Sequence, residues 1–144
     1  PAPGKRMLSS MTPTFMESKD KVAVLGTPGG SRIITMVLLG VLGYDQGLDA
    51  QAVAALPRYH HQWMPDEIEA ESNAFSPQTA AALQAMGHKL DLPGDSAAGG
   101  RGSSHVWGNL QTVLWDRKAG TLTGGSDPRN PVGKAEVMAA SVAK

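Results

Sequence analysis

Two adjacent glycines mark a place in this sequence where the chain could bind an anion. Gly29 and Gly30, the glycine pair, follow a short apolar stretch and precede the apolar run from Ile33 to Gly43. A helix that begins there leaves backbone N–H groups unpaired and carries partial positive charge, and glycine lets an anion approach closely. The spacing indicates a turn that binds a phosphate, a carboxylate or a developing oxyanion, or a tight turn that binds nothing.

Phosphate is the least supported of these ligands. A phosphate-binding P-loop places a lysine directly after its last glycine, whereas Ser31 follows the glycine pair. The dinucleotide-binding pattern G-x-G-x-x-G is also missing from this stretch. On spacing alone, a tight strand-to-helix turn without a ligand is the more common interpretation.

Ser9 and Ser10, the serine pair, form a second motif. Two adjacent hydroxyl groups at the start of a strand can bind a carboxylate, although serines are also frequent turn and cap residues. Taken alone, the serine pair is more typical of a turn. No Ser-His-Asp triad can be assigned, because a triad is defined by its geometry.

The histidines do not form a metal-binding pattern. His60 and His61 are adjacent, and adjacent side chains of a strand point to opposite faces, so they cannot both reach one ion. His88 and His105 lie on other segments without a usual ligand spacing. We expect structural histidines, no metal and no cofactor.

Three further groups of residues have a structural interpretation. Asp66 and Glu67 follow a proline and indicate a solvated turn, and the stretch from Ser126 to Arg129 favours an Asp-led turn over an Asp–Arg pair. The tryptophans are expected in a core or an interface, because the chain has no basic groove of the kind that accompanies a base-stacking platform. They are Trp63, Trp107 and Trp115.

Composition limits the classes of protein that this chain can represent. Its 144 residues fit a single domain piece, with 13 basic and 13 acidic residues that form no basic block for nucleic acid. There is no cysteine, which excludes disulfides and a cysteine nucleophile. The longest apolar run is shorter than the roughly 20 residues of a membrane span, so we expect a buried core helix and no membrane span.

The order of the predicted elements indicates an α+β domain, with helices packed on a mainly antiparallel sheet. Pro57 and Gly87 are expected to end helices, and Asp49 and Ser76 to cap them. A Gly/Ser loop at 93–104 is too short to mark a domain boundary. The predicted strands are 11–18, 22–26, 58–64, 67–72, 88–92 and a hairpin of 105–116 with 120–128. The first predicted helix follows the break at 27–31 and runs to about residue 42, and the others span 48–58 and 76–87. The tail 132–144 is expected to be helical or frayed.

Taken together, the motifs resemble one family. From about Gly4 to Arg129, the order and separation of five stretches are similar to the C-terminal part of the small subunit of γ-glutamyltranspeptidase, also called glutathione hydrolase. The stretches are GKRMLSSMTPT, GTPGGSRIIT, PRYHHQWMPDE, FSPQTAAALQAMGHK and GGSDPR.

The resemblance implies a fold and a reaction. Members of the family are N-terminal-nucleophile hydrolases with a four-layer αββα sandwich, formed when a precursor cuts itself into a large and a small subunit. The first residue of the small subunit, a threonine, attacks the γ-glutamyl amide of glutathione and related compounds, and its α-amine serves as the base. The γ-glutamyl group of the resulting ester is then transferred to water or to an amino acid or peptide. By residue match, Ser9 and Ser10 would bind the α-carboxylate of the γ-glutamyl group, and the N–H groups of Gly29 and Gly30 would form the oxyanion hole.

The resemblance also implies what this chain lacks. Pro1 does not match the nucleophilic threonine, so we expect the threonine and further substrate contacts to lie upstream, and this chain to be inactive alone. The expected partners are the large subunit and the upstream part of the small subunit, and the expected location is periplasmic or secreted. The alternatives are a related acylase that processes cephalosporins or poly-γ-glutamate, or a non-catalytic carboxylate-binding or assembly domain.

Overall fold

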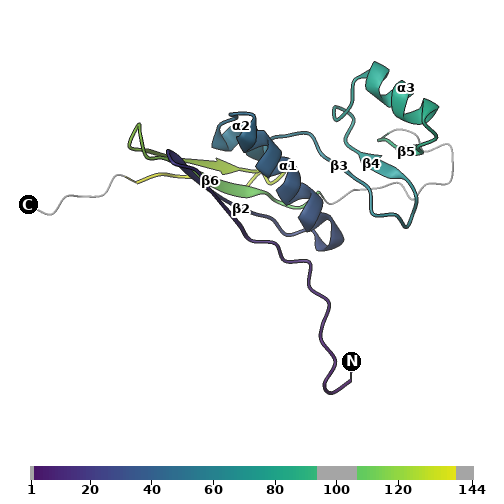
Figure 1. Ribbon diagram of the computed structural model, residues 1–144, viewed down its shortest axis with the longest axis horizontal. Helices are drawn as coiled ribbons and strands as arrows, with labels where there is room; N and C mark the ends of the chain where they lie inside the picture. The colour runs from purple at the N-terminus through teal and green to yellow at the C-terminus, as the bar shows by residue number, and fades with distance from the viewer. Residues whose placement is uncertain (1, 94–106, 139–144) are drawn as a thin grey trace, which may run out of the picture.

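The computed structural model describes residues 2–93 and 107–138, which form two small sheets and their helices (Figure 1). Most of the predicted Gly/Ser loop and the end of the predicted tail lie outside the described residues. The elements are β1 (Thr14–Glu17), β2 (Lys21–Gly26), the 3-10 turn η1 (Gly30–Arg32), α1 (Ile33–Asp45), α2 (Ala50–Ala54), β3 (Tyr59–His60), β4 (Ile68–Ala70), α3 (Pro77–Ala85), β5 (Leu90–Asp91), β6 (Gln111–Asp116) and β7 (Thr121–Ser126).

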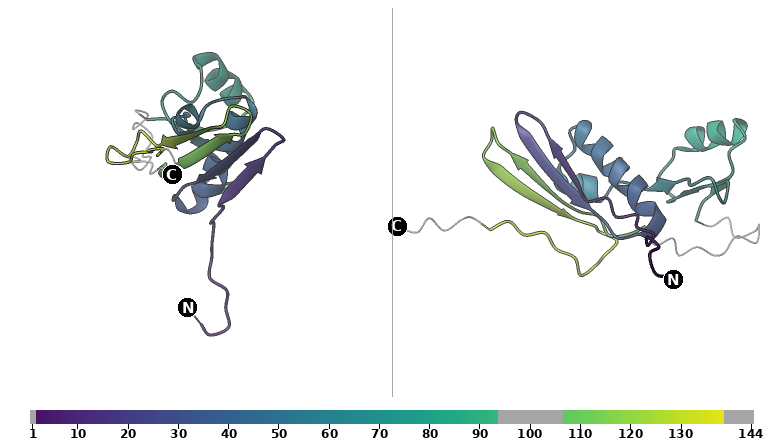
Figure 2. Two further views of the ribbon diagram at one scale, coloured as in Figure 1. Left: turned by 90° about the vertical axis from the view of Figure 1, so that its left-hand side faces the viewer. Right: turned by 60° about the horizontal axis from the view of Figure 1, so that its bottom comes forward.

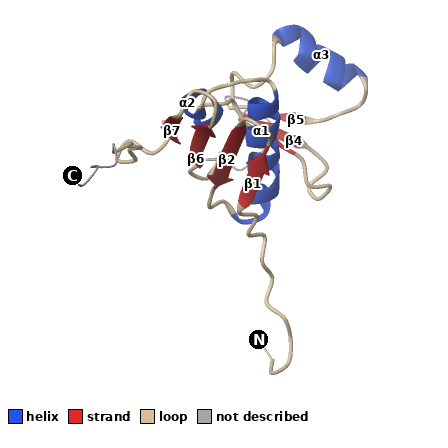
Figure 3. Cartoon of the chain, turned by 60° about the vertical axis from the view of Figure 1, so that its left-hand side comes forward, coloured by secondary structure: helices blue, strands red, loops and turns tan. Residues whose placement is uncertain are grey.

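The main sheet has four antiparallel strands in the order β1-β2-β6-β7 (Figure 3). Helices α1 and α2 lie on the same side of this sheet (Figure 2, right). Leu25 of β2 and Leu110 are buried beneath the helices with Val37 and Val53. A β-carbon at Gly40 of α1 would lie 2.7 Å from Leu25 Cδ1, so glycine allows α1 to approach the sheet closely.

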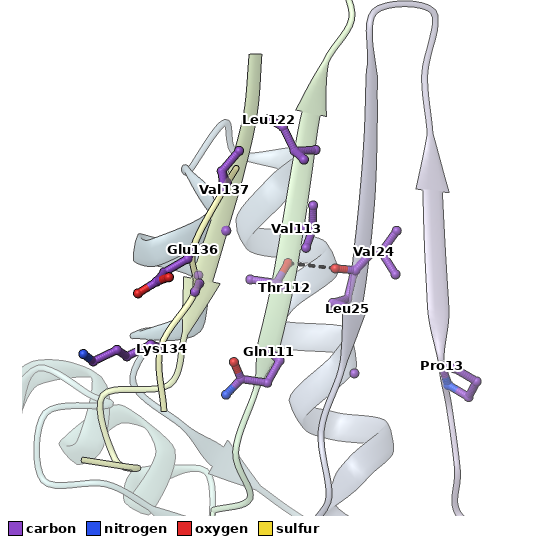
Figure 4. Close-up of a pocket in the computed structure, with 14 residues that line it drawn as sticks. Pro13, Val24, Leu25, Gln111, Thr112, Val113, Leu122, Lys134, Glu136 and Val137 are labelled. Carbon is purple, nitrogen blue, oxygen red and sulfur yellow. Dashed lines mark hydrogen bonds between the residues drawn. The ribbon is translucent and has the colours of Figure 1, made fainter. Parts of the chain in front are cut away.

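The opposite side of the main sheet is apolar and exposed. We call it the open face and define it by Phe15, Val113, Trp115 and Leu122, which are 40–74% exposed. In the strand register, Phe15 and Val113 both pair with Val24 of β2. Trp115 pairs with Leu122 two residues further along β6. Residues 134–137 line a shallow pocket on this face together with Val113 and Leu122 (Figure 4). Exposed apolar patches are typical of interaction surfaces.

The second sheet is smaller and has the order β3-β4-β5. Strands β3 and β4 are antiparallel, as predicted, whereas β4 and β5 are parallel because α3 connects them. Helix α3 begins as the sequence predicts, since the Ser76 hydroxyl oxygen accepts a hydrogen bond from the Thr79 N–H at 3.1 Å and Pro77 follows the cap. Gly87 ends it with a φ of 95°.

Two predictions are corrected by the structure. The strands form two sheets and not one. The second helix starts at the Asp49 cap as predicted, but its last residue is Ala54 and not the residue before Pro57. Proline disfavours helical geometry at the residue that precedes it. The long helix begins at Ile33 after a 3-10 turn, in agreement with the predicted break at 27–31. No helix among the described residues is long and apolar enough to cross a membrane.

Burial predicts unequal effects for two methionine substitutions. Met36 of α1 is 1% exposed, and Met86 at the end of α3 is 69% exposed. Met36→Ala should lower the free energy of unfolding of the intact protein by about 2–5 kcal/mol, because a cavity remains in the core. Met86→Ala should change it by less than about 0.5 kcal/mol. Urea unfolding of both variants measures the difference, and equal effects would contradict this packing.

Candidate functional site

The strand register brings the sequence motifs to one end of the main sheet. Thr14 pairs with Leu25, Gly26 with Gln111 and Gln111 with Ser126. In an antiparallel sheet, β1 therefore starts where β2 ends, β6 starts and β7 ends. The serine pair before β1, the glycine pair after β2 and Asp127 after β7 all extend from this end of the sheet.

The glycine pair forms a turn whose backbone favours glycine. Gly29 has a φ of 150° and Gly30 a φ of 59°, both in the region that other residues rarely adopt. The Gly29 carbonyl accepts a hydrogen bond from the Arg32 N–H at 3.2 Å, which starts η1. Among the described residues, no hydrogen bond uses the backbone N–H of Gly29 or Gly30. Within the described part of the chain, the turn thus holds two unpaired N–H donors where the 3-10 turn before the long helix begins.

Arg32 ties this turn to the second sheet. Its Nε donates a hydrogen bond to Glu69 Oε2 at 2.7 Å on β4, and its guanidinium carbon lies 5.9 Å from the centre of the Trp107 ring. Thr35, one turn further along, shares a 2.8 Å hydrogen bond with His60 Nδ1. These contacts connect η1 and the first turn of α1 to β3 and β4.

The serine pair lies in an extended segment. Ser9 is exposed and Ser10 is half-buried, and residues before β1 extend away from the sheet (Figure 1). Ser9 Oγ accepts only a long 3.4 Å hydrogen bond from the Met11 N–H. Within the described part of the chain, no hydrogen bond joins the serine pair to the glycine pair. The structure therefore brings the two motifs to the same end of the sheet without placing them in contact.

A buried ionic network lies beside the same end of the sheet. It consists of Arg58, Glu71, Asp127 and Arg129. Asp127 pairs with Arg58 and, at 3.1 Å, with Arg129, and Arg129 also pairs with Glu71. The side chains of Arg58 and Asp127 are 2% and 0% exposed, so this pair is removed from water.

The ionic network also holds backbone from several segments. Asp127 Oδ2 accepts a hydrogen bond from the Leu110 N–H at 2.8 Å, and Arg58 donates to the Trp107 carbonyl. Arg129 donates to the Leu56 carbonyl at 3.0 Å, just beyond α2. Residues 107–110, which we call the β6 lead-in, are thereby anchored by two of these charged side chains.

Hydrogen bonds keep the charges of the network in place. Burial acts to raise the pKa of Asp127, but the N–H groups of Arg129 and Leu110 and the charge of Arg58 outweigh it, so this pKa lies below its ordinary value. Burial acts to lower the pKa of Arg129, but Glu71 and Asp127 outweigh it and raise this pKa. Burial and the charge of Arg129 lower the pKa of Arg58, yet an arginine keeps its proton in a protein.

The sequence predicted only part of this network. The Asp-led turn exists, since Asp127 Oδ1 accepts from the Arg129 N–H at 3.0 Å, but the Asp–Arg pair that the sequence favoured less is also formed. Arg58 and Glu71 were not singled out. Arg58 lies 69 positions from Asp127, and no local spacing signals a contact of that range.

The remaining candidates have structural surroundings. His60 is buried between Thr35 and Gln62, whereas His61 points to an exposed Asp66 at 3.1 Å, so the two rings face different environments. Among the tryptophans, Trp107 is buried as predicted. Trp115 belongs to the open face and Trp63 is 75% exposed, so for these two the interface part of the prediction stays open.

Solved structures define the class of this fold. The γ-glutamyltranspeptidase of Pseudomonas nitroreducens in complex with L-DON superposes with a TM-score of 0.73 at 35% identity, covering 96% of this chain and 67% of that one. The Bacillus anthracis transpeptidase CapD superposes with a TM-score of 0.72 at 21% identity, covering 94% and 75%, a likeness of fold alone. The α+β fold is that of the N-terminal-nucleophile hydrolases.

Sequence comparison then gives the family. The family model described as gamma-glutamyltranspeptidase matches residues 1–137, and this chain belongs to that family. The glutathione hydrolase proenzyme of Escherichia coli K12 is 42% identical over 130 residues, which are 89% of this chain and 20% of that protein. The corresponding proenzyme of Pseudomonas sp. A14 is 47% identical over 93 residues, 63% of this chain and 16% of that protein. The chain therefore spans about a fifth of the length of these relatives or less.

The burial of Asp127 predicts a large loss of stability when its charge is removed. Asp127→Asn should lower the free energy of unfolding of the intact protein by about 3–5 kcal/mol, because Arg58 is left buried without its counter-ion. Asp66→Asn is the matched control, since the Asp66 side chain is 80% exposed and pairs with His61 at the surface. Its effect should stay below about 1 kcal/mol. Similar losses in the two variants would contradict a buried network.

The lowered pKa of Asp127 predicts an acid-dependent stability. The unfolded state binds a proton at Asp127 near pH 3.9, whereas the folded state resists it. The stabilisation is therefore complete above about pH 4 and is lost as the pH falls through the folded pKa. Urea unfolding between pH 3 and pH 7 should give a shallower acid decline for Asp127→Asn than for the unsubstituted protein. Parallel declines would show that Asp127 does not contribute.

Proposed function

We propose that this chain is part of an enzyme that cleaves the γ-glutamyl amide bond of glutathione and related compounds and transfers the γ-glutamyl group to water or to an amino acid or peptide. Family membership supports this reaction. The structural observation that supports it best concerns the backbone N–H groups of Gly29 and Gly30. Both are free of hydrogen bonds among the described residues and lie in a turn whose φ angles favour glycine. Donors of this kind stabilise the negative oxygen of a tetrahedral intermediate.

The proposed roles divide the site between this chain and a segment N-terminal to it. There, the hydroxyl oxygen of a threonine attacks the γ-carbonyl carbon, and the proton passes through the α-amine to the leaving amine. The carbonyl oxygen becomes negative and is bound by the N–H groups of Gly29 and Gly30. Ser9 and Ser10 hold the α-carboxylate of the substrate. Water or an amine then attacks the ester and releases the threonine.

The open face supports a protein partner for this chain. Its apolar side chains, Phe15 and Trp115 among them, lie exposed on one side of the main sheet. In a four-layer αββα sandwich, a second sheet covers this side. We propose that the large subunit and the upstream part of the small subunit supply it, and that the assembled enzyme is periplasmic or secreted.

Substitution of the serine pair tests the proposed function. In the intact protein, Ser9→Ala or Ser10→Ala should raise KM for a chromogenic γ-glutamyl anilide by about 10-fold or more, because a hydrogen bond to a carboxylate is lost. Ser72→Ala, at an exposed serine after β4, is the control and should leave KM unchanged. Steady-state kinetics measure both constants. An unchanged KM in both serine-pair variants would remove these serines from the substrate site, and absence of γ-glutamyl cleavage by the unsubstituted protein would overturn the function.

A further inference from the structure

We propose that Thr27 is a positioning residue that sets the direction of the N–H donors of the glycine pair. This inference rests on the proposed function, because it concerns how the oxyanion site is held and not what it binds. Thr27 directly follows β2, precedes Pro28 and is half-buried. It makes no contact with the reacting atoms in the proposed reaction, so its effect must pass through the backbone.

The hydroxyl group of Thr27 bridges two backbone segments. Thr27 Oγ1 donates a hydrogen bond to the Pro28 carbonyl at 2.7 Å and accepts one from the Asn109 N–H at 3.0 Å. A hydroxyl group can donate and accept at the same time, which a methyl group cannot. The side chain therefore links the turn before the glycine pair to the β6 lead-in.

The Pro28 carbonyl is the atom that matters for the oxyanion site. The carbonyl of Pro28 and the N–H of Gly29 belong to one planar peptide unit, and in a trans peptide they point in opposite directions. Fixing the direction of the carbonyl oxygen therefore fixes the direction of the Gly29 N–H. Gly30 follows Gly29 directly. The direction of the Gly30 N–H is therefore set by this peptide plane together with the torsion angles of Gly29.

Gly108 lies close to the same carbonyl. A β-carbon at Gly108 would lie 2.1 Å from the Pro28 oxygen and 2.5 Å from Thr27 Oγ1, so only glycine permits this approach. Gly108 has a φ of 74°, which also favours glycine. The Pro28 carbonyl thus accepts a hydrogen bond from Thr27 and has the backbone of Gly108 close to it, and both contacts restrict its rotation.

The β6 lead-in is itself anchored. The Leu110 N–H donates to Asp127 at 2.8 Å, and the Trp107 carbonyl accepts from Arg58, whose side chain is 2% exposed. A hydrogen bond from Thr27 to this segment therefore connects the glycine pair to the most deeply buried charges of the chain. Donors held in this way need no reorganisation when the oxyanion forms.

The chemistry predicts which kinetic constant should change. An oxyanion exists only along the reaction path, so misaligned donors weaken the transition state and leave substrate binding unchanged. Removal of a whole oxyanion donor costs about 100- to 1,000-fold in kcat. A donor that is present but misdirected should cost less, about 10- to 100-fold.

Substitutions at Thr27 in the intact enzyme test the proposal. Thr27→Val keeps the shape and removes the hydroxyl, whereas Thr27→Ser keeps the hydroxyl and is the matched control. With a chromogenic γ-glutamyl anilide, and with kcat expressed per active site titrated by the burst of released amine, Thr27→Val should lose about 10- to 100-fold in kcat with KM unchanged. Thr27→Ser should stay within about threefold of the unsubstituted enzyme. If Thr27→Val gives no titratable enzyme, Thr27→Ala is measured in the same way.

A second measurement separates positioning from general loss of structure. A boronic-acid analogue of the γ-glutamyl group forms a tetrahedral, negatively charged adduct with a hydroxyl nucleophile, whereas glutamate itself forms none. The inhibition constant of the boronate should rise in Thr27→Val by about the factor lost in kcat, and that of glutamate should not change. Equal changes for both inhibitors would overturn the proposal.

The outcomes also separate this proposal from the proposed function. An unsubstituted protein that does not cleave the anilide refutes the function. An active unsubstituted protein with full kcat in Thr27→Val, or with equal losses in Thr27→Val and Thr27→Ser, refutes the role of the hydroxyl and leaves the function standing.

Discussion

The buried pair of Arg58 and Asp127 is the interaction on which the candidate site depends. The pair is removed from water, so each charge requires the other as its counter-ion. Both side chains also form hydrogen bonds with backbone atoms of other segments. Asp127 accepts a hydrogen bond from the Leu110 N–H, and Arg58 donates one to the Trp107 carbonyl. Arg129, which pairs with Asp127, donates to the Leu56 carbonyl beyond α2. A single pair of charges thus fixes the relative positions of the start of β6, the end of β7 and the chain that leads into β3.

The two halves of the site are held with different rigidity. The glycine pair lies on a turn that is fixed on three sides, by β2, by the β6 lead-in and by the contact of Arg32 with Glu69. The serine pair lies in an extended segment, where Ser9 Oγ accepts a long hydrogen bond and the Ser10 carbonyl accepts one from Thr12 Oγ1. The proposed oxyanion donors are therefore held by contacts to distant segments of this chain, whereas the described contacts of the proposed carboxylate site are local.

Local signals in the sequence predicted the elements whose determinants lie within a few residues. The cap at Ser76, the stop at Gly87 and the β6–β7 hairpin are confirmed, because capping and tight turns depend on neighbouring residues. The two-sheet arrangement and the ionic network were missed. Their contacts join residues as far apart as Arg58 and Asp127, and neither periodicity nor spacing encodes a pairing over that distance.

The ambiguity of the glycine pair has the same physical origin. Two glycines before a helix supply unpaired N–H groups in any protein, and the sequence alone left an empty turn as the more common outcome. What distinguishes an anion site is whether these donors keep one direction. In this chain that direction is decided by the Pro28 peptide plane, which is held by Thr27 and Gly108, and through them by charges far along the sequence. The motif supplies the donors, and the long-range packing of the domain holds them in one direction.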